Sequence, residues 1–493
     1  MTEPCRYPLD EIAARLPAII YGPPPVAHPC LIQADSRRVR PGDCFCACHP
    51  DARVRSGHIA AAVAAGARAV IRPEAEAIDA VTVLVHPRPR AALARIGVWA
   101  WGLDVACPPL VAVTGTDGKT TTAWCLQHLA GLGAALVGTL GLDAGDGLRP
   151  GSNTTPGPAE LHPFLAGLTP SCPVVAIEAS SIGLDQDRLA GLRLRAIIHT
   201  GIGHDHLDYH HSMSAYVAAK QRILDLAEDS ARVVLNADDP ALTTCAELAH
   251  QRGLRLVSLG HGAGTWRLHH EADAWHLVDG RHVHRLQVPL PGSFNAWNVA
   301  AAILALAEDD DQIAALAEAS ARLQPPPGRL ERLADGPITY VDYAHTPQAV
   351  ERVIAALRQT HPGRRLACVF GCGGDRDRAK RGPMGHAALG ADVAVLTSDN
   401  SRSESPAAIA SDVISALPAS AVVRQEAPWS PADMVVVLDR AAAIRLGRTL
   451  AGVEGVVVVC GKGHETGQEE AGVTRPWDDR RFVMALGREV PHV

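Results

Sequence analysis

The sequence is poor in aromatic residues and has no surplus of basic ones. Phe, Trp and Tyr together make up 4% of the 493 residues, and 46 Lys and Arg are outnumbered by 53 Asp and Glu, for a net charge of −7. Nucleic-acid-binding proteins typically carry a basic patch, and many stack bases on aromatic side chains. The composition therefore disfavours a nucleic-acid partner.

Long hydrophobic runs are missing as well. No apolar segment reaches the ~18–20 residues that a membrane-spanning helix requires. The first residues, Met1–Cys5, lack the basic start and the apolar core of a signal peptide. We therefore expect a cytoplasmic protein that is not inserted in a membrane, and we expect it to be a monomer.

Cysteine is too sparse for a disulfide-stapled scaffold, with 12 residues in the whole chain. One cluster, Cys44, Cys46 and Cys48 followed by His49, has spacing that loosely resembles a metal site. Side chains alternate along a strand, so a strand here would place all three thiols on one face, where a tetrahedral cage is hard to close. We favour a buried strand face over metal or redox chemistry.

The residues that are abundant indicate a multidomain globular protein. Hydrophobic residues make up 47% of the chain and charged residues 20%, which excludes intrinsic disorder. The length corresponds to about three domains of ~100–200 residues each. Proline-rich breaks at Cys107–Pro109 and Gln324–Gly328 lead us to predict domains at 1–107, 108–323 and 324–493.

Strand-like and helical patterns alternate in all three regions. In the first, strands near Asp43–Cys48 and Ala69–Ile71 flank a helix over Ile59–Ala65, which follows Gly57 and His58. In the second, strands are predicted at Leu110–Thr114, Val174–Glu178, Ala196–Thr200, Arg232–Asn236 and Leu254–Leu259. The third has strands at Ile338–Tyr343, Leu366–Phe370, Val393–Thr397 and Gly455–Cys460, with helices at Pro347–Gln359 and Pro406–Leu417. This alternation is typical of parallel sheets with crossover helices.

A glycine-containing loop joins the strand at Leu110–Thr114 to a helical pattern. Gly115–Thr121 matches a shortened P-loop, because the full pattern needs glycine where this chain has Val113. In such a loop, backbone N–H groups surround phosphate oxygens, Lys119 neutralises phosphate charge, and the Thr120 hydroxyl reaches Mg²⁺. A nucleotide site is the favoured interpretation, and a chance loop match the alternative.

Three further groups in the second region are candidates for chemistry. Glu178 ends a predicted parallel strand, where it could hold Mg²⁺ or could belong to a capped helix start. His204–His210 follows the next strand and suggests metal or phosphate binding, although a solvated loop has the same composition. Lys220 lies in a helical stretch, Ala215–Ile223, whose other residues are mostly small or apolar, and a solvated lysine is the default for it.

Three loops of the third region combine glycines with charged residues. They are Gly371–Asp377, Ser398–Arg402 and Gly461–Glu465, and each follows a predicted strand. Loops that follow parallel strands meet at one edge of the sheet. Such a set is suited to a pocket that recognises carboxylates and amines, and simple turns are the alternative.

These motifs, in this order, resemble the Mur ligase family, and most closely its ligases that act on UDP-N-acetylmuramoyl-L-alanyl-D-glutamate. The resemblance extends from about Asp35 to the C-terminus. Besides the phosphate loop and the three loops of the third region, it includes Asp35–Arg37, Pro41-Gly42, Asn153–Pro156, Glu178–Arg188, Asp205–His210, Phe294–Asn298, Gly328–Glu331 and Asp342–Pro347.

The resemblance implies a fold and a reaction. The fold is α/β with three domains: a small N-terminal domain that holds UDP, a central P-loop ATPase domain with a parallel sheet, and a C-terminal dinucleotide-fold-like domain that delivers an amino acid. In the reaction, ATP phosphorylates the glutamyl carboxylate of UDP-MurNAc-L-Ala-D-Glu. An amino group of meso-diaminopimelate then attacks the acyl phosphate, so the small-molecule partners are these substrates and the cofactors are ATP and Mg²⁺.

The resemblance also implies a role for each matching residue. The triphosphate would be held by Gly115, Thr116, Gly118, Lys119, Thr120 and Thr121, and adenosine with phosphate by Asn295, Asn298, Arg329 and Asp342. Mg²⁺ would be held by Thr120, Glu178 and His206. The UDP-muramoyl dipeptide would contact Ser36, Asn153, Thr154, Thr155, Ser180 and Arg188, and diaminopimelate would contact Arg376, Asn400, Arg402, Gly461 and Glu465. The catalytic residues would be Lys119, Glu178, His206 and Lys220.

The resemblance changes the interpretation of Lys220 from a solvated lysine to a catalytic residue. It matches a family lysine that becomes carbamylated, which converts a cation into an anion that can support Mg²⁺. An amine must lose its proton before it reacts with CO₂. We therefore expect Lys220 among charges or apolar walls that lower its pKa.

The sequence departs from the family pattern at a few positions. Ser401 replaces a proline next to Arg402, Ile182 replaces a histidine, Gly201 replaces an asparagine, and Asp117 replaces the commoner asparagine. The helix after Gly57 and His58 is also about two residues short.

Retention of Arg402 favours diaminopimelate over lysine, because a guanidinium binds a carboxylate through two parallel hydrogen bonds. The departures leave two alternatives. One is a paralogue that joins a different amino acid or acceptor in a specialised pathway, and the other is a non-catalytic homologue that binds a nucleotide or a UDP-sugar. Retention of Lys119, Glu178, His206 and Lys220 argues against the second.

Overall fold

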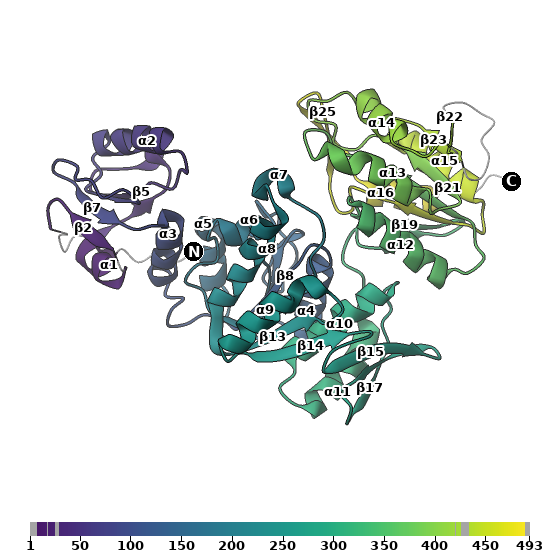
Figure 1. Cartoon of the computed structure of the whole chain (residues 1–493), viewed down its shortest axis with the longest axis horizontal. Helices are drawn as coiled ribbons and strands as arrows, with labels where there is room; N and C mark the ends of the chain where they lie inside the picture. Colours follow the sequence, from purple (N-terminus) through teal and green to yellow (C-terminus); the bar gives the residue numbers. More distant parts are fainter. Residues whose placement is uncertain (1–6, 17, 25–28, 420, 425–432, 489–493) are drawn as a thin grey trace.

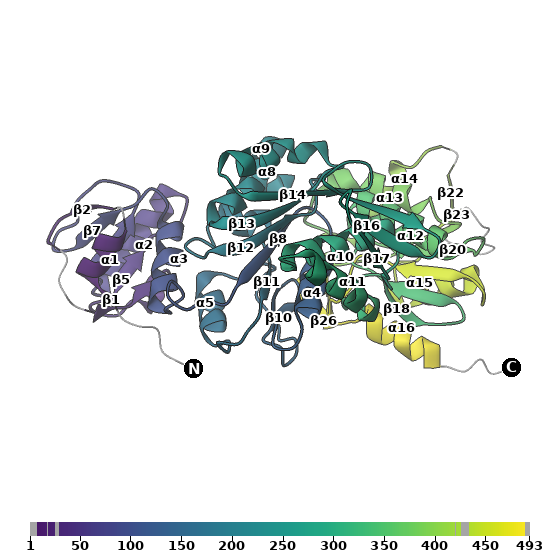
Figure 2. The ribbon, with the colours of Figure 1, turned by 90° about the horizontal axis from the view of Figure 1, so that it is seen from below.

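The computed structural model describes residues 7–488 apart from 17, 25–28, 420 and 425–432. Met1–Cys5, considered above for a signal peptide, lie outside this part of the chain. An N-terminal, a central and a C-terminal region, each with its own sheet, follow one another along the molecule (Figures 1 and 2). Within the described residues, no helix has the length and apolar character needed to cross a membrane.

The N-terminal region is a small mixed α/β unit. Its sheet has the order β2 (Ile19–Tyr21), β7 (Thr82–Val85), β6 (Ala69–Arg72), β5 (Cys44–Cys46) and β4 (Ile32–Gln33), and β1 (Tyr7–Pro8) pairs with β3 (Pro29–Cys30). Its helices are α1 (Leu9–Arg15), η1 (Ser36–Arg38), α2 (Ala52–Ala64) and α3 (Pro89–Ala100).

The helix predicted over Ile59–Ala65 corresponds to α2, and its predicted start is wrong. The Asp51 carboxylate accepts hydrogen bonds from the backbone N–H groups of Arg53 and Val54, so α2 begins at Ala52, and Gly57 and His58 lie inside it. The expected strand face at Cys44 and Cys46 is confirmed: both are fully buried in one core cluster, against which Cys48 packs.

The central region is built on a long, mostly parallel sheet. The strand order is β10 (Gly141–Asp143), β9 (Ala135–Gly138), β11 (Val175–Glu178), β8 (Leu110–Thr114), β12 (Leu194–His199), β13 (Ala227–Asn236), β14 (Arg255–Gly260), β15 (Trp266–Glu271), β16 (Ala274–Val278) and β17 (Val283–Leu286). Pairing is parallel from β9 to β15 and antiparallel at both ends. All five predicted strands are present, whereas the antiparallel ends were not predicted.

Helices cover both faces of this sheet because its central strands are apolar on both sides. Val111 and Val113 of β8 pack against α4 and α10, and Leu110 and Ala112 pack against α5 on the other face. The helices are α4 (Lys119–Ala130), α5 (Pro158–Ala166), α6 (Ser181–Asp185), α7 (Leu207–His210), α8 (Met213–Gln221), η2 (Arg222–Leu226), η3 (Pro240–Leu242), α9 (Thr243–Gln251), α10 (Ser293–Leu306), α11 (Asp310–Ala319) and η4 (Ser320–Arg322).

The C-terminal region repeats the parallel architecture. Its sheet has the order β18 (Glu331–Ala334), β19 (Ile338–Val341), β24 (Val456–Val459), β20 (Leu366–Phe370), β21 (Val393–Leu396), β23 (Asp433–Val436) and β22 (Val422–Arg424), and β18 is the antiparallel strand. Its helices are α12 (Pro347–Thr360), η5 (Arg378–Lys380), α13 (Arg381–Ala388), α14 (Pro406–Ser415), α15 (Arg440–Ala451) and α16 (Asp479–Arg488), with a hairpin of β25 (Gly467–Glu470) and β26 (Val473–Pro476). The predicted α/β fold class is confirmed.

Candidate active site

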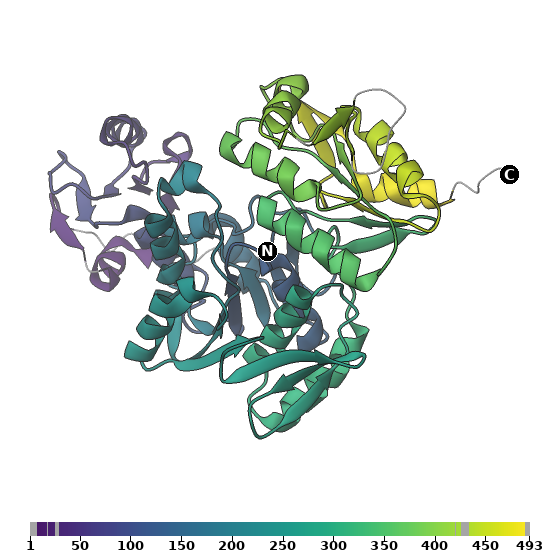
Figure 3. The same ribbon diagram turned by 45° about the vertical axis from the view of Figure 1, so that its right-hand side comes forward.

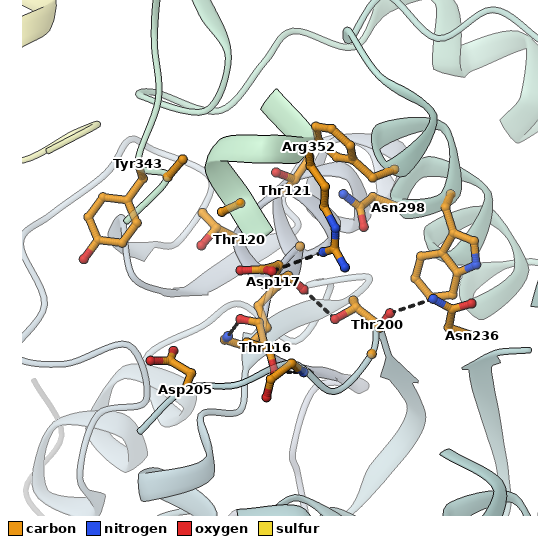
Figure 4. A pocket seen from close by; sticks show the side chains of 18 of the residues that line it. Thr116, Asp117, Thr120, Thr121, Thr200, Asp205, Asn236, Asn298, Tyr343 and Arg352 are labelled. Carbon is orange, nitrogen blue, oxygen red and sulfur yellow. Dashed lines mark hydrogen bonds and ion pairs between the residues drawn. The ribbon is translucent and has the colours of Figure 1, made fainter. Parts of the chain in front are cut away.

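The carboxyl ends of the central strands meet in a cavity of about 690 Å³, which residues of the C-terminal region also line (Figure 4). Figure 3 shows the C-terminal region beside the central region. Every residue predicted to bind nucleotide or metal lines this cavity except Gly115, which is the residue before Thr116 in the phosphate loop. Those that line it are Thr116, Gly118, Lys119, Thr120, Thr121, Glu178, His206, Asn295, Asn298, Arg329 and Asp342. Lys220 lines it too. A volume of this size fits a small-molecule ligand.

Two glycines allow the phosphate loop to turn from β8 into α4. Gly115 and Gly118 have φ angles of 142° and 83°, in the region that side chains disfavour. A Cβ at Gly115 would overlap the Thr200 hydroxyl, and one at Gly118 would lie 2.8 Å from the Asn298 amide oxygen. The Thr116 N–H donates to the Gly201 carbonyl at 2.9 Å, so Gly201 helps to hold the loop.

Both candidate catalytic lysines donate to the same carbonyl oxygen. Lys119 Nζ lies 2.9 Å from Gly115 O and 2.7 Å from Thr116 O, and Lys220 Nζ lies 2.7 Å from Gly115 O. Lys220 is 1% exposed, which corrects the default of a solvated lysine. Burial lowers the pKa of Lys220 far below that of a free lysine, and the Lys119 charge lowers it further.

Glu178 is held at the end of β11 by hydrogen bonds to two threonines. Thr120 Oγ1 donates to Glu178 Oε2 at 2.9 Å, and the Thr139 N–H and hydroxyl donate at 2.8 and 3.0 Å. Arg329, from the start of the C-terminal region, donates to Thr120 Oγ1 at 3.3 Å. A carboxylate and a hydroxyl oxygen side by side are the hard ligands that Mg²⁺ prefers.

His206 lines the same cavity, and its Nε2 lies 3.5 Å from the Asp205 carboxylate. Burial lowers the pKa of His206; Asp205 opposes this shift, and Lys119 adds to it. Burial alone would raise the pKa of Asp205. Attraction between its carboxylate and the neighbouring cations, chiefly the protonated forms of His206 and His345 and the Lys119 ammonium group, outweighs burial and lowers that pKa. The structure therefore favours a neutral imidazole, the form that binds metals, next to an ionised carboxylate.

The cavity is also lined by α10 and by residues of the C-terminal region that lie just before β18, just after β19 and on α12. Asn298 donates to Asn295 at 3.3 Å, and the Arg329 guanidinium stacks on Tyr343 at 4.2 Å from the ring centre. Asp342 accepts hydrogen bonds from two backbone N–H groups, and burial raises its pKa. These side chains offer hydrogen bonds and an aromatic face, as a nucleoside requires.

A second cavity of about 500 Å³ lies in the C-terminal region and adjoins the first. All residues predicted to bind the incoming amino acid line it: Arg376, Asn400, Arg402, Gly461 and Glu465. Asn400 Nδ2 donates to Glu465 Oε2 at 2.8 Å, and Arg402 Nη1 donates to the Gly374 carbonyl at 2.6 Å. Asp205, His206, Tyr343 and His345 line both cavities.

The residues predicted to bind the UDP-muramoyl dipeptide are more dispersed. Thr154 and Ser180 line the first cavity, whereas Asn153 is exposed and Ser36 belongs to the N-terminal region. Thr155 is fully buried, and its hydroxyl donates to the Glu178 carbonyl at 2.7 Å, so it supports the cavity wall and does not face the cavity. Arg188 donates to the Thr155 carbonyl at 2.6 Å.

Sequence reasoning missed three residues that organise the site. Thr139 follows β9 at the same sheet edge as Glu178, so the rule that found Glu178 could have found it too. Lys462 is fully buried and donates to both Asn400 and Glu465 at 2.9 Å; its glycine-rich loop was the available signal. Arg352 pairs with Asp117 at 3.1 Å across two regions, and no sequence signal indicates that pair.

Two family models match this chain in the order of its regions. The Mur ligase middle domain matches residues 113–306, and the Mur ligase, glutamate ligase domain matches residues 328–463. A UDP-N-acetylmuramoyl-L-alanyl-D-glutamate--2,6-diaminopimelate ligase from Chromobacterium violaceum is 38% identical over 476 residues, which is 92% of this chain and 93% of the relative. The chain belongs to the Mur ligase family.

Other comparisons agree with this assignment. The ligase of the same name from Caulobacter vibrioides is 40% identical over 474 residues, with 91% of this chain and 93% of the relative covered. A solved structure of such a diaminopimelate ligase superposes with a TM-score of 0.68 at 30% identity, and covers 98% of this chain and 99% of its own. The resemblance inferred from the motifs is confirmed, as is the three-region Mur ligase fold.

Proposed function

We propose that this Mur ligase is an ATP-dependent, Mg²⁺-requiring cytoplasmic enzyme, active as a monomer, that adds meso-diaminopimelate to UDP-MurNAc-L-Ala-D-Glu in peptidoglycan precursor synthesis. The observation that carries the proposal is the meeting of two cavities at His206, Asp205, Tyr343 and His345. One has the residues for a nucleotide, and the other has those for an amino acid. The matched relatives bear the name of this reaction.

The three regions divide the work in this proposal. Residues 1–107 bind the UDP part of the acceptor, residues 108–323 bind ATP, and residues 324–493 bind the amino acid. Each substrate then enters from a different region and reacts where the cavities join. Ser36, Asn153, Thr154, Ser180 and Arg188 contact the acceptor. Thr155 holds two of them, Ser180 and Arg188, by hydrogen bonds from the buried side.

The phosphate loop supplies the positive charge for phosphoryl transfer. The N–H groups of Gly118, Lys119 and Thr120 at the start of α4 face the phosphates, with Asn295, Asn298, Arg329 and Asp342 around adenosine and phosphate. Thr120 and Glu178 offer a hydroxyl and a carboxylate oxygen, the ligands that Mg²⁺ prefers, and His206 of the same cavity would add an imidazole; Mg²⁺ bound there would neutralise phosphate charge.

The chemistry follows from this placement of charge. The acceptor carboxylate attacks the γ-phosphorus of ATP, and the bond to ADP breaks while Lys119 stabilises the charge that moves onto ADP. The amine of the incoming amino acid then attacks the acyl carbon, loses a proton, and displaces phosphate. Asp205 lies where the cavities join and is ionised, so it can accept that proton directly or through water.

Lys220 acts as a carbamate in this proposal. Its neutral amine attacks CO₂, a C–N bond forms, and one proton leaves, so that a buried cation site becomes an anion beside the phosphate loop. The lowered pKa and the close approach to Gly115 support this assignment. An anion there attracts the cations of the phosphate site.

Amino-acid choice belongs to the second cavity. Arg402 pairs with the distal carboxylate of diaminopimelate, and Asn400 and Glu465 hold the ammonium group beside it. Lys462 orients both Asn400 and Glu465. Ser401 favours a second candidate, a ligase of the same chemistry for another amino acid: its hydroxyl is buried without a hydrogen-bond partner in the described residues, where the family has proline.

Phosphate release measured with UDP-MurNAc-L-Ala-D-Glu, ATP, Mg²⁺ and one amino acid at a time tests the proposal. We expect turnover with meso-diaminopimelate and much less with lysine. Turnover of another amino acid alone would select the second candidate. No phosphate release and no ATP binding with any acceptor would contradict the ligase proposal itself.

A further inference from the structure

The hairpin of β15 and β16 carries a cluster of possible metal ligands that lies outside the lining of both cavities (β15 is labelled in Figure 1). The ligand atoms of His269, Glu271 and His276 all lie within 4.8 Å of one another. Within the described part of the chain, no other group of three or more His, Cys, Asp and Glu side chains brings its ligand atoms this close together. None of the three lines a cavity of the candidate active site.

Strand register explains why these three side chains converge. His269 and Glu271 are two residues apart on β15 and share one face, and His276 of β16 is the direct partner of His269. The opposite face is fixed by Leu268 and Leu277, which pair with each other and are fully buried in the core. A register shift would bury the histidines, so the hairpin holds the cluster on its outer face.

Two further observations point to a ligand. The imidazoles of His269 and His276 stack with their centres 5.5 Å apart and their planes inclined by 20°. His276 Nδ1 is shielded from solvent and has no hydrogen-bond partner in the described residues. A buried ring nitrogen without a partner is costly, and a metal ion is one partner that it can accept.

We propose that His269, Glu271 and His276 bind a transition-metal ion of the Zn²⁺ class. Two imidazoles and one carboxylate are a common donor set for Zn²⁺, whereas a set in which imidazoles outnumber oxygen ligands does not suit Mg²⁺. Metal–ligand bonds of ~2.0–2.1 Å bring neighbouring ligand atoms to roughly 3.3 Å. His269 and Glu271 are exposed and can close the remaining distance by small side-chain rotations, with water as the fourth ligand.

The charges around the cluster limit its affinity. Arg267 lies two residues before His269 on the same face, and Arg285 of β17 is the partner of His276. Both cations oppose a divalent ion, and Glu271 offsets one of them. We therefore expect micromolar affinity, and weaker binding when protonation of the imidazoles competes with the metal.

Isothermal titration of the untagged, metal-stripped full chain with ZnCl₂ tests the proposal. Excess Mg²⁺ in the buffer competes with Zn²⁺ for the oxygen ligands Thr120 and Glu178 of the proposed active-site metal site, whose third ligand is the single imidazole of His206. We expect one saturable Zn²⁺ site that H269A and H276A each weaken at least ~10-fold, with a smaller loss in E271Q. H270A is the matched control, because His270 is the next residue of β15 and belongs to the other face.

X-ray absorption of the bound Zn²⁺ provides the second measurement. Nitrogen and oxygen ligands without sulfur agree with the hairpin site. Sulfur ligands would assign the ion to the cysteines near Cys44 and would overturn the proposal, as would equal losses in H270A and H276A or no saturable binding. Thermal unfolding followed by circular dichroism confirms that each variant is folded.

Discussion

At the scale of single residues, the candidate site depends on two lysines that face one carbonyl oxygen. Lys119 begins α4, where the helix dipole and free backbone N–H groups favour an anion such as phosphate. Lys220 is buried beside it, and two like charges so close favour loss of one proton. The two side chains of the same type therefore have different roles, and the environment decides which.

Replacement of Lys119 by alanine removes the cation that stabilises charge on the departing ADP. We expect phosphate release to fall at least ~100-fold. Arg193→Ala is a matched control, because Arg193 is 61% exposed and lies outside both cavities. Near wild-type turnover by a folded K119A variant would contradict the phosphate-loop assignment.

Replacement of Lys220 tests the carbamate. We expect K220A to lose most activity and to regain part of it with added short carboxylates, which replace the missing anion. K220R keeps a positive charge but forms no carbamate, so it should stay inactive with or without carboxylate. Mass spectrometry under native conditions should detect the added CO₂ on the wild type alone. Full activity of K220R would exclude this role.

Replacement of Arg402 tests amino-acid selection. A charge-assisted hydrogen bond contributes about 1.5–3 kcal/mol, and each 1.4 kcal/mol is about tenfold in affinity. We expect R402A to lose ~10–100-fold in kcat/KM for diaminopimelate and little for lysine, which narrows the preference. Arg378→Ala is the control, since Arg378 pairs with Glu404 and does not line the cavity. A uniform loss for both amino acids would indicate a structural role.

At the scale of elements, a buried histidine joins the N-terminal and central regions. His162 of α5 is 1% exposed, and its ring lies against Gly97 of α3, where a Cβ would overlap it. Neither ring nitrogen has a hydrogen-bond partner among the described residues, and burial lowers the pKa of His162 to about 4. This contact requires a neutral imidazole.

Because of this lowered pKa, the stability of the folded protein should depend on pH. In the unfolded chain, His162 gains a proton near its free pKa of ~6.5, well above its pKa in the folded protein. The contribution of His162 is thus fully present above about pH 6.5 and is lost toward pH 4, by up to ~1.4 kcal/mol per pH unit. We expect the melting temperature of His162→Leu to fall less than that of the wild type between pH 7 and pH 5. Equal decreases would contradict the assignment.

At the scale of the whole molecule, the proposed nucleotide site combines residues of the central and C-terminal regions. Arg329 of the C-terminal region donates to Thr120. Arg352 of α12 pairs with Asp117 of the phosphate loop, as Figure 4 shows. The two arginines differ in their surroundings. Arg329 also stacks on Tyr343, whereas the side chain of Arg352 is 57% exposed.

This difference predicts different effects of their removal. An exposed ion pair contributes about 0–1 kcal/mol, so R352A should change the melting temperature very little and the KM for ATP modestly. R329A loses a charge-assisted contact beside the reacting phosphates, and kcat/KM for ATP should fall ~10–100-fold. Steady-state kinetics on both variants checks this order, and a larger loss in R352A would contradict it.

The sequence by itself was sufficient to predict the strands that are apolar on both faces and the loops that follow them. Leu110–Thr114, Leu366–Phe370 and the loop after each were predicted because hydrophobic runs, glycines and charges are local signals. The antiparallel strands β15–β17 were missed, because their half-exposed faces mix polar and apolar residues. The predicted start of α2 was wrong because the helix begins directly after the N-cap Asp51, before the apolar pattern from which it was predicted.

Only the tertiary structure decided what each site residue contacts. Lys220 and Lys462 have nothing in their local sequence that predicts complete burial, because burial results from segments packed against them from elsewhere in the chain. Thr155 matches a substrate-binding motif and yet faces inward, and Asp117 and Arg352 pair across 235 positions. Composition and periodicity determine which elements form, whereas long-range packing determines which side chains share a cavity and which charges they feel there.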